Sequence, residues 1–128
     1  MRTEFNITIK ESSKTDLTAR ERVLLKDTSN AVKLDEVVTE DGTPFVLSPA
    51  AYAVLSVHNE KAKSDDKDYE QYLILDSDGN KYVTGSQSFW NSFADIWSDM
   101  EGEPFELSIY KKPSKNYTGK CFLTCSIV

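Results

Sequence analysis

The chain has few of the residues that enzymes and metal sites require. Its 128 residues include a single histidine and only two cysteines. A tetrahedral zinc site needs four ligands, and His58 with Cys121 and Cys125 falls short of that number. His58 also lacks a companion nucleophile, since the sequence has no Gly-x-Ser-x-Gly motif and no glycine-rich phosphate loop. The sequence therefore predicts a protein that is not an enzyme and uses no metal and no other cofactor.

Long hydrophobic runs are also missing. No stretch approaches the roughly 18 apolar residues of a membrane helix, and residues 1–10 lack the apolar block of a secretory signal. We therefore expect a cytoplasmic protein with no membrane partner. In the alternating segment 121–127 the two cysteines would share one strand face about 13 Å apart, too far for a disulfide. Both are interpreted as small core residues.

The distribution of charge is uneven along the chain. The net charge is −6, which taken alone disfavours a nucleic-acid partner. However, residues 31–80 carry 11 acidic and 4 basic groups, whereas residues 108–128 carry four lysines and no Asp or Glu. Hydrophobic residues make up 39% of the chain, enough for one packed domain at this length. The C-terminal segment is thus a cationic region within an anionic chain.

A period of two predicts mainly β-structure. Segments 32–38 and 45–47 flank turn residues at 40–43, which predicts a hairpin. A second hairpin is predicted around the Asp-Ser-Asp-Gly-Asn turn at 76–80, because Gly and Asn tolerate positive φ. The predicted strands are residues 5–9, 32–38, 45–47, 50–57, 69–75, 81–84, 105–110 and 121–127.

Two helices are predicted, one of them long. Hydrophobic residues recur at helical spacing from Phe89 to Met100, after a serine N-cap at 86 or 88 and before Gly102 and Pro104. The short helix follows a capping box formed by the threonine at 18 and the glutamate at 21. The long helix separates the third and fourth strands counted from residue 50.

This order of elements is that of the OB-fold, a five-stranded Greek-key barrel that binds oligonucleotides or oligosaccharides. We therefore expect one OB-like domain over residues 1–128. Its barrel core would be residues 50–128. Residues 1–48 would form an N-terminal extension made of a short strand, a short helix and a hairpin.

The clearest functional signal lies in residues 110–122. Lysines suit phosphates and aromatic rings stack on bases, and OB-folds close over a bound strand with the loop in this place. The candidate nucleic-acid-binding residues are Tyr110, Lys111, Lys112, Lys115, Tyr117, Lys120 and Phe122. Alternatively, the lysines provide solubility or protect a sheet edge, and the N-terminal strand or hairpin covers the rings.

Other candidates carry weaker signals. Trp90 lies beside the main stripe of the long helix, where it either contacts a partner or widens the buried face. Asp65, Asp66, Asp68 and Glu70 could hold Mg²⁺ as in a nuclease, but interleaved lysines favour a solvated turn.

Three runs resemble small single-stranded DNA-binding proteins encoded by phages and mobile elements of bacteria. They are Leu-Thr-Ala-Arg-Glu-Arg to Asp-Thr-Ser at 17–29, Asp-Gly-Asn-Lys-Tyr-Val-Thr-Gly-Ser at 78–86, and Pro-Ser-Lys-Asn-Tyr to Cys-Phe-Leu-Thr-Cys at 113–125. The resemblance implies an OB-type barrel that coats single-stranded DNA during replication or transfer. Cellular single-strand binders have a flexible acidic tail, whereas this chain ends on a predicted strand. That difference argues against recruitment of host repair proteins through such a tail.

The sequence thus predicts a non-sequence-specific single-stranded DNA-binding protein of phage or mobile-element replication or transfer. Its expected partners are single-stranded DNA, replication proteins and further copies of the chain. The main alternative is an inhibitor or protein-interaction module that mimics DNA through the acidic residues Asp35, Glu36, Asp65, Asp66 and Asp68. A metal-dependent nuclease is the third hypothesis.

Overall fold

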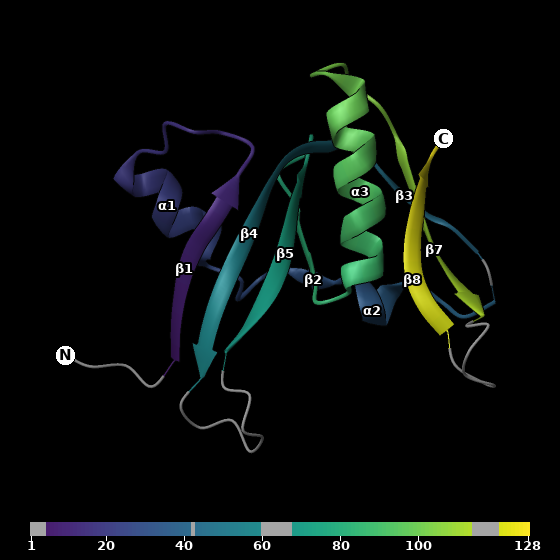
Figure 1. The fold of residues 1–128 in the computed structure, drawn as a ribbon, viewed down its shortest axis with the longest axis horizontal. Coiled ribbons are helices and arrows are strands. Elements are labelled where there is room, and N and C mark those ends of the chain that lie inside the picture. The colour runs from purple at the N-terminus through teal and green to yellow at the C-terminus, as the bar shows by residue number, and fades with distance from the viewer. Residues whose placement is uncertain (1–4, 42, 60–67, 114–120) are drawn as a thin grey trace.

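The computed structural model describes residues 5–41, 43–59, 68–113 and 121–128 (Figure 1). These residues are mainly β-structure, as predicted, with three helices. In chain order the elements are β1 (Phe5–Ser12), α1 (Ala19–Lys26), β2 (Val32–Lys33), α2 (Leu34–Val37), β3 (Phe45–Leu47), β4 (Pro49–Asn59), β5 (Asp68–Asp76), β6 (Lys81–Thr84), α3 (Gln87–Met100), β7 (Leu107–Pro113) and β8 (Cys121–Ile127).

Two sheets flank the long helix α3. One has five strands in the order β1-β4-β5-β6-β2, and the other has three in the order β3-β7-β8. Figure 1 shows α3, in green, between the two sheets. The main core fills this region with Phe89 and Phe93 of α3, Ile74 of β5, and Leu107 and Ile109 of β7, all fully buried. The apolar stripe of α3 therefore holds the two sheets together.

The opposite face of the five-stranded sheet has a smaller core. Its buried residues are Ala53, Leu55, Leu73 and Val83, against which Ile7, Ile9, Leu25 and Ala31 pack. The amine of Lys81 donates hydrogen bonds to the carbonyl oxygens of Leu24, in the last turn of α1, and of Asp27, the C-cap residue of that helix. The N-terminal segment is thus attached to the face of the sheet that α3 does not cover.

The expected barrel does not close among the described residues. Only Ser48 separates β3 from β4, so the chain passes there from the three-stranded to the five-stranded sheet. On the other side, β6 pairs with β5 and β2, and β8 pairs with β7 and packs against α3. A closed five-stranded barrel would need β6 to pair with β8, and α3 lies between the two sheets instead.

The hairpin predicted for residues 32–47 is wrong. Val32 and Lys33 pair in parallel with β6, the next four residues form the helical turn α2, and β3 pairs with β7. Leu34 and Val38 are both buried in the main core. Leu34 and Val38 are four residues apart, and residues at this spacing share a face both on a helix and on a strand. Their spacing could therefore not distinguish a helix from a strand.

The hairpin of β5 and β6 and the long helix are confirmed. Gly79 adopts a φ of 89° in the turn, as the Asp-Gly-Asn sequence predicts. The N-cap of α3 is Ser86, whose hydroxyl accepts a hydrogen bond from the backbone N–H of Phe89. No helix of the described residues is long and apolar enough to cross a membrane.

Both cysteines lie on β8 and have free thiols. Cys125 is buried in the main core, as expected, and burial raises the pKa of its thiol to about 12. Cys121 is only half-buried. The thiolate is the form of cysteine that reacts with oxidants and alkylating reagents, so Cys125 is protected both by its position and by its protonation.

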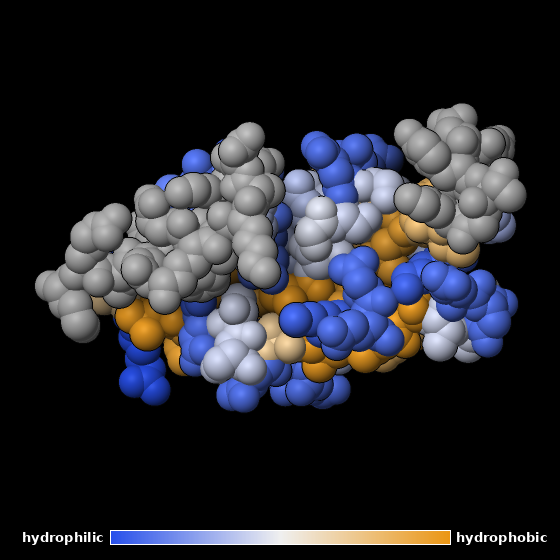
Figure 2. Space-filling model, turned by 90° about the horizontal axis from the view of Figure 1, so that it is seen from below, coloured by the Kyte–Doolittle hydropathy of each residue, from blue (hydrophilic) through white to orange (hydrophobic). Residues whose placement is uncertain are grey.

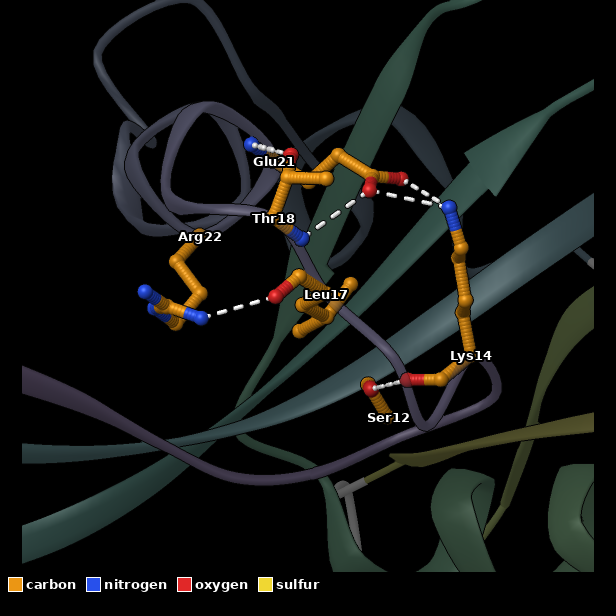
Figure 3. Close-up of polar contacts among 6 residues, drawn as sticks. All are labelled: Ser12, Lys14, Leu17, Thr18, Glu21 and Arg22. Carbon is orange, nitrogen blue, oxygen red and sulfur yellow. Dashed lines mark hydrogen bonds and ion pairs between the residues drawn. The ribbon is translucent and has the colours of Figure 1, made fainter.

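The capping box of α1 is confirmed (Figure 3). The Thr18 hydroxyl accepts from the Glu21 backbone N–H at 3.1 Å, and the Glu21 carboxylate accepts from the Thr18 backbone N–H at 3.1 Å. Lys14 also donates to Glu21, and this hydrogen bond, followed by the one from Thr18, lowers the pKa of the Glu21 carboxyl. None of the residues of α1 is buried, so these end contacts contribute much of its local stability.

Thr18→Ala should therefore loosen α1 without unfolding the sheets. Loss of an N-cap costs about 1 kcal/mol, which corresponds to a roughly fivefold larger population of the locally opened helix. Amide hydrogen exchange of residues 21–25 measures this opening. Thr15→Ala removes an exposed threonine outside the helix and is the matched control. Equal exchange rates in the two variants would contradict a role for the cap.

Candidate nucleic-acid interface

The predicted site falls on the hairpin of β7 and β8. The register pairs Lys112 with Phe122 and Tyr110 with Thr124, so these side chains share one face of the sheet. The alternate residues Ile109, Leu123 and Cys125 are buried in the main core. Figure 2 shows the molecule from below, the side on which β7 ends and β8 begins. Hydrophobic residues reach the surface on this side, between hydrophilic ones.

Three of the predicted residues are close together on this face, and we call Tyr110, Lys112 and Phe122 the hairpin face. The amine of Lys112 lies 5.7 Å from the centroid of the Tyr110 ring, within reach of a cation–π interaction. The hydroxyl of Tyr110 is 2.7 Å from that of Ser126, which fixes the direction of the ring. Phe122 is 38% exposed. Tyr110 is half-buried. One cation, one exposed ring and one partly exposed ring can contact the phosphate and bases of a single strand.

Lys111 does not belong to the hairpin face. Neighbouring residues of a strand point to opposite sides, and the amine of Lys111 donates to the carbonyl oxygen of Asp35 at 2.9 Å. The Asp35 carboxylate in turn accepts from the hydroxyl of Thr84 at 2.7 Å. Lys111 therefore links β7 to α2, and through Asp35 to β6. The predicted residues Lys115, Tyr117 and Lys120 lie outside the described residues.

The acidic residues of the alternative hypothesis are on separate elements. Asp35 and Glu36 belong to α2, and Asp68 begins β5, where its carboxylate is 2.6 Å from Nδ1 of His58. Asp65 and Asp66 lie outside the described residues. Glu70, named with them as a magnesium ligand, forms an ion pair with Lys10. Within the described ranges, no group of three or more His, Cys, Asp and Glu residues could hold a metal ion.

Trp90 packs against the five-stranded sheet. Its ring stacks on Tyr72 with centroids 4.8 Å apart and planes 5° apart, and it meets the edge of Tyr52 at 5.3 Å. Of the two interpretations of Trp90, the structure therefore favours the wider buried face.

A cavity at the other end of α3 was not predicted. The helix and β7 approach one another there through Gly102 and Pro104, which the sequence marked only as a helix stop. The signal that could have found it is a run of carboxylates: residues 82–110 contain five and have neither Lys nor Arg.

No protein-family model matches the chain, and no curated protein and no solved structure does so either. The proposed binding surfaces therefore depend on the chain's own residues and geometry.

Proposed function

We propose that the protein binds single-stranded DNA without reading its sequence, through the hairpin face. The observation that carries the proposal is the common orientation of Tyr110, Lys112 and Phe122 on β7 and β8. Every base has a π-face, so stacking on exposed rings is tolerant of sequence. A nearby lysine adds a phosphate contact, and no carboxylate side chain in residues 108–128 opposes it.

The proposal includes an open variant of the OB architecture. From β4 onward, three strands, a helix and two strands follow in the OB order. The segment β3–β4 runs through both sheets, as a bent first strand would, and pairs with β7 and β5. The β7–β8 connection then takes the place of the loop with which OB-folds contact oligonucleotides. Action in phage or mobile-element DNA replication or transfer, beside replication proteins, is supported by the sequence resemblance alone.

Lys112→Ala/Phe122→Ala should weaken binding to a fluorescein-labelled single-stranded oligonucleotide by at least about tenfold. Loss of one stacked base alone costs about 1–3 kcal/mol. Loss of one phosphate contact should also lower the slope of log affinity against log salt by about 0.7. Fluorescence anisotropy at two salt concentrations measures both effects. A duplex of the same sequence should bind more weakly, since its bases are already stacked on one another.

Lys33→Ala is the matched control for charge, because Lys33 is an exposed lysine on β2, in the other sheet. This variant should bind the oligonucleotide like the unmodified protein. The proposal is wrong if Lys33→Ala weakens binding as much as the double variant. It is also wrong if the unmodified protein binds no single-stranded DNA, or binds it independently of salt.

A further inference from the structure

The cavity missed by the sequence prediction lies where α3 ends and β4 and β7 begin. Its volume is about 720 Å³, within the range of small-ligand sites. In Figure 1 the C-terminal end of α3 is at the top of the molecule, whereas β7 ends and β8 begins at the bottom. The lining residues are Ser48, Pro49, Ala50, Ser77, Trp97, Met100, Gly102, Glu103, Pro104, Phe105 and Glu106.

Two aromatic rings give the cavity an ordered apolar wall. The centroids of Trp97 and Phe105 are 6.2 Å apart with an interplanar angle of 69°. Trp97 also meets Tyr52 edge-on at 5.3 Å and contacts Phe93 at 5.8 Å. Both lining rings are half-buried, so they reach the cavity while the main core holds them in place. An occupant would therefore meet rings that are already oriented.

The electrostatic environment of the cavity is negative. Glu103 and Glu106 line it and are exposed, and none of the described lining residues is Lys, Arg or His. The C-terminal end of α3 carries the negative end of the helix dipole, and its last turn has no basic residue to offset it. The C-cap residue, Glu101, adds another carboxylate. These groups together favour a cationic occupant.

An arginine side chain matches this combination best. Its planar guanidinium stacks on aromatic rings and forms paired hydrogen bonds with carboxylates, whereas the ammonium of lysine is compact and strongly hydrated. Further carboxylates lie on the same helix outside the lining, because Asp95 and Asp99 are exposed on α3 one turn apart. Carboxylates both in the cavity and elsewhere on this helix suit a segment of a basic protein better than a free small amine.

We propose that this cavity docks an arginine from a basic segment of a partner protein, with Trp97 and Phe105 contacting its guanidinium plane and Glu103 and Glu106 its N–H groups. This site is at the opposite end of α3 from the hairpin face, so a strand of DNA and the partner could be bound together. The inference uses none of the residues of the DNA-binding proposal. Either proposal can therefore fail without the other.

A fluorescein-labelled peptide of alternating arginine and glycine is the probe. It should bind the full chain, and a peptide with citrulline in place of arginine should bind at least about tenfold more weakly, because citrulline keeps the shape and loses the charge. Glu103→Gln/Glu106→Gln should weaken binding of the arginine peptide by about the same factor. Ala50→Phe, at an exposed position in the lining, should block the cavity without removing any charge.

Asp95→Asn/Asp99→Asn is the matched control, since it removes two exposed carboxylates of α3 that do not line the cavity. This double variant should weaken binding of the arginine peptide by less than about threefold. Equal effects of the two double variants, equal affinity for the citrulline peptide, or full binding by Ala50→Phe would each overturn the proposal. Self-association that Ala50→Phe abolishes, with no peptide binding, would assign the cavity to a second copy of the chain and also overturn it. All these variants should bind single-stranded DNA normally.

Discussion

Phe93→Ala is expected to lower the free energy of unfolding by about 3–5 kcal/mol, the usual cost of removing a buried phenyl ring. Phe93 is fully buried between the two sheets. Its ring contacts those of Tyr52, Phe89, Trp90 and Trp97. Small domains commonly have only about 5–15 kcal/mol of total stability, so this one change would remove much of it. Urea unfolding followed by circular dichroism measures the difference.

Phe122→Ala is the control, since it makes the same chemical change on the exposed hairpin face. Phe122→Ala should lower the free energy of unfolding by less than about 1 kcal/mol. Comparable losses in the two variants would contradict the packing of α3 between the sheets. The control also establishes whether weaker DNA binding by Phe122 variants reflects lost contacts or a less stable fold.

Local patterns were sufficient for the elements whose signals lie within one segment. Phe89 and Phe93 are one helical turn apart and both lie in the main core, as the stripe of α3 predicts. The β5–β6 hairpin follows from its Asp-Gly-Asn turn, and the start of α1 follows from its capping box. In each case the residues that decide the structure are close neighbours in sequence.

The pairing of distant segments could not be predicted in this way. β3 has only three residues, and its partner β7 lies some sixty residues further along the chain. The choice between β7 and a nearer strand depends on tertiary packing more than on strand propensity. The sequence predicts a strand at Leu34 for the same reason, because only the packed core shows that this residue belongs to a helical turn.

The candidate site was predicted in part. Alternation places Tyr110, Lys112 and Phe122 on one face once β7 and β8 pair. The sequence groups Lys111 with them because it predicts that a loop begins after residue 110, but β7 continues to Pro113 and directs Lys111 toward α2. The acidic cavity was missed because its lining comes from segments near residues 48–50, 77 and 97–106, which only the fold brings together.

The turn between β5 and β6 offers a test of electrostatics. Asp76 is buried, and its carboxylate accepts hydrogen bonds from the backbone N–H groups of Asp78 and Asn80 at 3.0 and 2.8 Å. It also accepts from the side chains of Asn80 and Tyr82. Burial alone would raise the pKa of Asp76, but these hydrogen bonds, led by that from the Asn80 backbone, outweigh burial and lower the pKa.

Asp76→Asn should lower the free energy of unfolding by about 1–3 kcal/mol at neutral pH, because an amide accepts fewer hydrogen bonds than a carboxylate. A lowered folded-state pKa stabilises the protein above the unfolded-state pKa, and this stabilisation is lost as pH falls through the folded-state value. The difference between the two proteins should therefore shrink below about pH 4. Asp78→Asn is the control, because Asp78 is exposed and lies two residues further along the same turn. It should lower the free energy of unfolding by less than about 0.5 kcal/mol. An equal loss in Asp78→Asn, or a difference that is constant from pH 7 to pH 3, would show that the Asp76 carboxylate does not stabilise this turn.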